Sequence, residues 1–157
     1  MTPTAPPKLL IALVVGLLTV ACGEPEHEHE THEYDDEGQI CFGESSFPEM
    51  SDAQAPEEGE AIELTVIFNS CLSSSCSEFH ETSCAIERDG TTITVNSQGS
   101  YTDTTPPDGA CTADCGSLSA TCQGPELEAG TYTIEHGDET WEFDVPPGDD
   151  DPACFGE

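Results

Sequence analysis

Three histidines near the start of the chain have the types and spacing that best fit metal chemistry. His27, His29 and His32 fall within six residues and alternate with glutamates. Imidazole nitrogens bind Zn²⁺, Cu²⁺ and Ni²⁺, and short histidine-rich tracts hold such ions loosely. The His-Glu-x-x-His spacing of zinc proteases is absent, so the tract predicts at most a weakly bound divalent metal and no other cofactor. The same residues also fit a solvated linker in which histidine is one more polar side chain.

Cysteines form the second chemically active group. In a short exported chain, an even number of cysteines indicates a disulfide framework. The chain has nine cysteines, so eight are left for disulfides if Cys22 does not form one. No Cys-x-x-Cys pair occurs, so neither a zinc knuckle nor a thioredoxin-type redox motif is expected. The candidates for disulfide formation are Cys41, Cys71, Cys76, Cys84, Cys111, Cys115, Cys122 and Cys154.

Two disulfide pairs can be suggested from the sequence. The tetrapeptide that begins at Cys41, Cys-Phe-Gly-Glu, recurs at Cys154, and the ends of a compact domain often lie close together. This echo suggests the pair Cys41–Cys154. Cys84 and Cys122 both point to the core side of their expected strands, which suggests a bridge between two sheets. Eight cysteines allow roughly a hundred pairings, so the other four stay unassigned.

The charge balance excludes several classes of partner. The chain has 33 acidic and two basic residues, a formal net charge of −31, and Arg88 is the only lysine or arginine after Cys22. Such a surface repels nucleic acid and anionic lipid headgroups. It can attract divalent cations or dock a basic partner, and it also fits a protein adapted to a salty medium. We expect a monomer with no nucleic-acid partner.

The sequence contains no recognisable catalytic set. It lacks the Gly-x-Ser-x-Gly elbow of hydrolases and any glycine-rich loop that could hold a phosphate. Two further histidines, His80 and His136, are expected at the surface, the first in a loop and the second at the end of a hairpin. We therefore predict a protein that is not an enzyme. A hydrolase remains a third alternative because loops of a β-sandwich can carry any site.

Alternation of apolar and polar residues predicts several short strands. In residues 61–68, the side chains of Ile62, Leu64, Val66 and Phe68 share one face, as in a half-buried strand. An Asp-Gly turn at residues 89–90 predicts a hairpin. Residues 70–83 and 104–116 are expected to be loops. The other expected strands are residues 84–87, 92–95, 117–122, 131–136 and 140–145. The predicted fold is all-β, a small, disulfide-stapled antiparallel β-sandwich of immunoglobulin-like type.

The first 21 residues have the composition of an export signal. Lys8 precedes an apolar run of 13 residues, too short for a membrane span, which needs about 20. Leu18-Thr19-Val20-Ala21-Cys22 resembles the lipobox of bacterial lipoproteins, although Thr19 stands where leucine is usual. This resemblance implies cleavage before Cys22 and a lipid on its sulfur. Gly23, where an aspartate would signal retention, implies the outer membrane of the bacterial cell envelope.

After the signal we expect two further parts. Residues 22–39 are expected to be the lipidated cysteine and a disordered acidic tether, because this stretch cannot bury enough apolar surface to fold. Residues 24–39 would reach about 50 Å when fully extended. The domain itself is placed at residues 40–157.

Two looser resemblances concern the domain. The segment from Leu127 to Ile134, with its Ala-Gly-Thr-Tyr turn, resembles the closing strands of immunoglobulin-like extracellular modules. The cysteine-rich middle is similar to uncharacterised secreted lipoproteins of myxobacterial type. Together with the lipobox, these resemblances imply a lipid-anchored binding or surface-structural module with an unknown ligand or protein partner. The alternative is a metal-capture lipoprotein that uses His27, His29 and His32.

Overall fold

The structure is a computed structural model that describes residues 29–43, 54–106, 109–148 and 152–156. Within these residues there is no helix, and consequently none that is long and apolar enough to cross a membrane. The strands are β1 (Glu30–Asp35), β2 (Gln39–Phe42), β3 (Ala61–Leu72), β4 (Ser77–Asp89), β5 (Thr92–Asp103), β6 (Gly116–Glu126), β7 (Gly130–His136), β8 (Glu139–Val145) and β9 (Cys154–Phe155).

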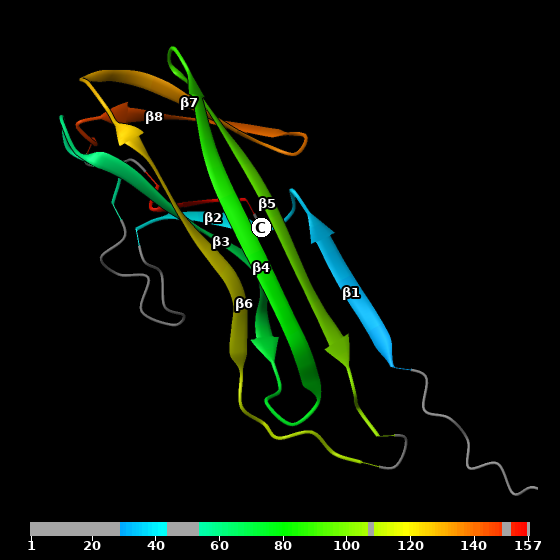
Figure 1. Ribbon diagram of the computed structural model, residues 1–157. Helices are drawn as coiled ribbons and strands as arrows, with labels where there is room; N and C mark the ends of the chain where they lie inside the picture. The colour runs from blue at the N-terminus through cyan, green and yellow to red at the C-terminus, as the bar shows by residue number, and fades with distance from the viewer. Residues whose placement is uncertain (1–28, 44–53, 107–108, 149–151, 157) are drawn as a thin grey trace, which may run out of the picture.

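These strands form two sheets, so the predicted β-sandwich is confirmed. In the first sheet, β4 and β5 make one long hairpin, and β1 lies beside the C-terminal half of β5 (Figure 1). The first three residues of β5 pair with β7, which in turn pairs with β8. The second sheet has the order β6-β3-β2-β9. One detail departs from the expected antiparallel pattern, because the β5–β7 pairing is parallel over the three residue pairs that start at Thr92 and Thr133.

The core lies between the inner faces of the two sheets and contains most of the large apolar side chains. Phe42 from the second sheet packs edge-on against Phe143 from the first, with ring centroids 5.0 Å apart, and against Phe155 at 5.6 Å. Tyr132 is buried beside Phe143, and its hydroxyl donates to the Glu128 carbonyl oxygen at 3.0 Å. Such aromatic contacts stabilise a small core beyond the area that they bury.

Most expected strands occur, and the central hairpin is longer than its apolar residues indicated. The Asp-Gly turn joins β4 to β5 as predicted, but both strands extend far beyond residues 84–87 and 92–95. The expected loop at residues 70–83 is wrong over much of its length, because β4 already begins at Ser77. The first five residues of β4, Ser-Glu-Phe-His-Glu, have no apolar alternation. Pairing with β5 holds this polar segment in a strand, where tertiary context overrides local propensity.

The largest correction concerns the expected tether. Residues 30–39 are not a disordered linker, because β1 pairs with β5 over six residues and β2 starts at Gln39. The strand places His32 and Tyr34 on the inner side, where His32 stacks on Tyr101 at 4.7 Å and Tyr34 packs against the core. Residues 30–39 therefore belong to the folded domain.

Candidate functional site

A polar groove of about 530 Å³ crosses the outer face of the first sheet, over β1, β5 and β4. The strand register produces it, because antiparallel partners point to the same side. Glu33 and Glu81 flank Ser100 in one cross-strand row, and Asp35 and Ser83 flank Gln98 in the next. The groove is therefore a shallow trough. The carboxylates of Glu33 and Asp35 on β1 line one side, and Glu81 on β4 lines the other.

This groove continues into two neighbouring hollows, of about 310 and 630 Å³, because Asp35 lines all three. The largest hollow lies between the β1–β2 turn and the β7–β8 turn. The two turns touch closely: a Cβ added at Gly137 would lie 2.5 Å from the Asp36 carbonyl oxygen, so only glycine fits. We call the joined hollows the acidic trough. Its acidic side chains are Glu33, Asp35, Asp36, Glu37, Glu81, Asp138 and Glu139.

No lysine or arginine lines the acidic trough. Arg88, the only such residue of the domain, is held elsewhere: Nε donates to the Gly90 carbonyl oxygen at 2.8 Å, and Nη1 donates to that of Glu126 at 3.1 Å. Its guanidinium also lies 5.3 Å from the centre of the Tyr132 ring. A concave surface lined by carboxylates concentrates the negative potential, so the trough attracts cations.

His136 is the buried titratable group next to the trough, and its position corrects the sequence-based expectation of a surface residue. Its side chain is only 3 % exposed, and Nε2 lies 2.8 Å from the Ser97 hydroxyl. Burial lowers the pKa of His136, while the carboxylates of Asp36 and Glu139 oppose this effect. The Ser97 amide donates to Asp36 Oδ1 at 2.6 Å.

These contacts combine a serine, a histidine and an aspartate, the residue types of a hydrolytic triad. Their arrangement is different, however, because Asp36 bonds the Ser97 backbone and the Ser97 side chain is only 2 % exposed. A catalytic serine must reach a substrate carbonyl. The arrangement acts as a buried polar tie that joins β5 to β7 and to the β1–β2 turn. In the sequence, the Gly137-Asp138 turn predicted the hairpin that contains His136. It did not predict on which side of the sheet the His136 side chain lies.

The predicted metal ligands are not gathered into a site in the part of the chain that the structure describes. Cys22 and His27 lie outside the described residues. His29 is exposed just before β1, whereas His32 is in β1 and half-buried against Tyr101. Among the described residues, no group of three histidine, cysteine or acidic side chains could hold a metal ion. Metal capture by this tract stays a prediction.

Four disulfides staple the sandwich. Cys41–Cys154 joins β2 to β9, and Cys84–Cys122 joins β4 of the first sheet to β6 of the second, so both are pairs that the sequence suggested. The other two, Cys71–Cys115 and Cys76–Cys111, are nested and tie the β5–β6 connection to the end of β3 and to the β3–β4 turn.

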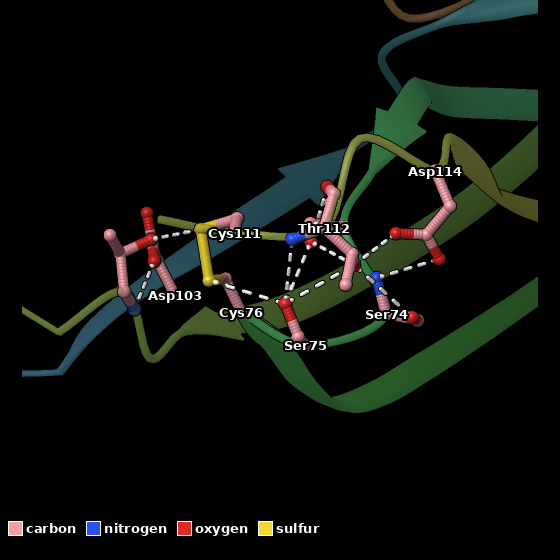
Figure 2. Close-up of a disulfide and its surroundings, with 9 residues drawn as sticks. Ser74, Ser75, Cys76, Asp103, Cys111, Thr112 and Asp114 are labelled. Atoms are coloured by element: carbon pink, nitrogen blue, oxygen red, sulfur yellow. Dashed lines mark hydrogen bonds between the residues drawn. A yellow bond between two sulfur atoms is a disulfide. The ribbon is translucent and has the colours of Figure 1, made fainter. Parts of the chain in front are cut away.

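Hydroxyl groups reinforce the region around these two nested bridges (Figure 2). Ser75 Oγ accepts from the Thr112 amide at 2.9 Å, and the Ser74 amide donates to Asp114 Oδ2 at 3.3 Å. Thr112 Oγ1 also donates to Asp114 Oδ1. Hydrogen bonds from Ser74 and Thr112 hold the pKa of Asp114 below its usual value. We call residues 71–76 and 109–115, with their two bridges, the stapled end.

Comparisons with known proteins support the fold. No significant match occurs among the curated proteins or among the solved structures. A family model described as the ORF11 beta-sandwich domain matches residues 66–145, which is just over half of the chain and includes the strands from most of β3 to β8. The chain therefore belongs to the ORF11 beta-sandwich domain family.

Proposed function

We propose that this protein is a lipid-anchored, extracytoplasmic binding module whose acidic trough holds a cationic ligand or the basic surface of a partner. Anchoring rests on the lipobox resemblance at Cys22. The four disulfides support the location, because such bridges persist in oxidising compartments. The proposed role is binding and not catalysis.

One observation carries the binding role: the trough is concave and its charged walls are carboxylates. Glu33 and Glu81 face the same hollow from opposite sides of β5, and Asp35 connects this hollow with the other two. An extended peptide with several lysines could follow this path with each ammonium near a carboxylate. Close charge pairs of this kind accelerate association and add specificity, and salt weakens them.

The anchor is tested on the full chain isolated from the membranes of its own cells. We expect mass spectrometry to find a mature protein that begins at Cys22 and carries a lipid on the sulfur. A Cys22→Ala variant should leave the membrane fraction. An intact Met1, or an unmodified Cys22 in membrane-bound protein, would contradict the proposed anchor.

The trough is tested with a fluorescent hexalysine peptide and two charge-matched variants. The first variant carries Glu33→Gln, Asp35→Asn and Glu81→Gln. The control carries Glu87→Gln, Glu135→Gln and Glu142→Gln, exposed residues on the strands of the same sheet that do not line the trough. Both lose three negative charges. We expect the trough variant to weaken binding about tenfold, which corresponds to about 1.4 kcal/mol, and the control to change it much less. Equal losses would show that net charge alone attracts the peptide.

A further inference from the structure

Phe79 is out of place in this molecule. Its side chain is 75 % exposed, and it is the only large hydrophobic residue so exposed among those that the structure describes. The other described aromatic residues are buried or half-buried in the core region. Single exposed apolar residues are common on proteins. Phe79 needs a reason because its backbone is unusual as well.

The backbone at Phe79 has a φ of 54°, in the left-handed region. This conformation disfavours residues with a bulky side chain. Elsewhere in the described chain, positive φ values fall on glycines and on Asp36, whose carboxylate is held by the Ser97 amide. Phe79 has no comparable compensation. Glycine or asparagine would meet the local backbone requirement at lower energy, so folding does not explain a phenylalanine here.

A β-bulge produces this conformation. Glu78 pairs with Thr102 and Glu81 pairs with Ser100, so two residues of β4, Phe79 and His80, lie opposite Tyr101 alone. Bulges redirect side chains and are common next to functional sites. Here the bulge displays the Phe79 ring to solvent. His80, the other residue of the bulge, lines a hollow of about 190 Å³ together with Leu72 and Gly116.

The bulge stands on a rigid base. It begins only three residues after Cys76, which is bridged to Cys111 in the stapled end (Figure 2). Ser77 and Glu78 continue the pairing with β5 directly before Phe79. An aromatic side chain on a fixed base loses little conformational entropy on binding, which is the property of anchor residues at protein interfaces.

The surrounding charge selects the occupant. Glu78 and Glu81 border the bulge, and the chain carries a net charge of −31. Anionic lipid headgroups and a second copy of the same chain would both be repelled. A protein with an apolar pocket bordered by lysine and arginine is complementary in both shape and charge.

We propose that Phe79 is the anchor of a docking site for such a protein, with the ring in the apolar pocket and with Glu78 and Glu81 facing the basic border. Glu81 also lines the acidic trough, but Phe79 and Glu78 do not, so the anchor of this site does not depend on a ligand in the trough. The adjoining hollow beside His80 accepts a side chain of the partner.

The test uses the full-length chain in the cells that produce it, with the photocrosslinking residue p-benzoylphenylalanine at position 79. The same residue at position 87, an exposed site further along β4, is the matched control. We expect one protein adduct from position 79 and none from position 87. The partner, identified by mass spectrometry and purified, should bind the unmodified chain, and binding should weaken with added salt.

The variant Phe79→Asn completes the test because asparagine tolerates the left-handed backbone and lacks the ring. We expect it to fold fully and to lose at least about tenfold in affinity for the purified partner, whereas Phe79→Trp retains binding. Unchanged affinity of Phe79→Asn overturns the proposal. So does an adduct with lipid, an adduct with a second copy of the chain, or no adduct from position 79.

Discussion

Buried polar residues give this sandwich a dependence on pH. Because burial holds the pKa of His136 below its ordinary value, the unfolded chain takes up a proton there before the folded chain does. The stabilising contribution is therefore complete above the ordinary histidine pKa, near 6.5, and is lost as the pH falls from there through the lower folded value.

We expect the free energy of unfolding in urea to fall between pH 7.5 and pH 5, and to fall less steeply for His136→Gln. Glutamine can keep a hydrogen bond to the Ser97 hydroxyl but does not titrate. Parallel pH profiles for the two proteins would show that His136 does not set this slope.

At Phe79, stability and display of the ring oppose each other. Asparagine relieves the left-handed backbone of a bulky side chain and gives up almost no buried surface, since the ring is 75 % exposed. We expect Phe79→Asn to raise the free energy of unfolding by about 1 kcal/mol. Thermal and urea denaturation measure this, with Glu78→Gln as a neighbouring control. A destabilised Phe79→Asn would mean that the ring supports the fold.

At the scale of single residues, the sequence predicted two of the four bridges better than the buried histidine. The bridge pairs followed from a repeated tetrapeptide and from alternation, which survive in the fold. The burial of His136 depends on the contact between Gly137 and Asp36, which are a hundred residues apart in the chain. Local pattern carries no signal of that contact. For the same reason, the acidic trough could not be found in advance, because its rows arise from strand register.

At the scale of elements, β1 is the strand that the sequence hid. Half of its residues are acidic, and only His32 and Tyr34 pack inward, so composition alone indicated disorder. Pairing with β5 supplies the hydrogen bonds that the segment cannot make by itself. Strong alternation, by contrast, correctly predicted strands within β3, β6, β7 and β8, where apolar residues fill one face.

Removing β1 should therefore cost stability. We expect a soluble form that starts at residue 36 to unfold about 3 kcal/mol more easily than one that starts at residue 29, since it loses the aromatic contacts of His32 and Tyr34 and a strand pairing. Urea denaturation measures the difference. A form that starts at residue 23 controls for the acidic residues that precede β1. Equal stability of the forms starting at 29 and 36 would mean that β1 is only loosely attached.

At the scale of the whole molecule, the four bridges are unequal. Cys41–Cys154 closes a loop with a sequence separation of 113, while Cys76–Cys111 closes one of 35 inside the loop of Cys71–Cys115. A longer closed loop restricts the unfolded chain more.

We expect the double variant Cys41→Ala/Cys154→Ala to lose about 4 kcal/mol of stability, and Cys76→Ala/Cys111→Ala to lose about 2–3 kcal/mol. Guanidinium denaturation without reductant tests this order. The reverse order would mean that strain or residual structure, and not loop length, governs their contributions.

The Cys41–Cys154 bridge has a mechanical consequence for a domain held through Cys22. In that case only residues 23–29 separate the lipid from β1, a tether of at most about 25 Å. Tension on this tether reaches β1 first. The force can separate β1 from β5 while the rest of the sandwich stays folded. Peeling stops at Cys41, because its sulfur is bonded to Cys154 on β9. We expect single-molecule pulling to record one early extension of up to about 35 Å and then a firm stop, which disappears in the Cys41→Ala/Cys154→Ala variant. If Cys22 carries the proposed anchor, the bridge thus gives the domain a second tether length, released by force and limited by a covalent bond.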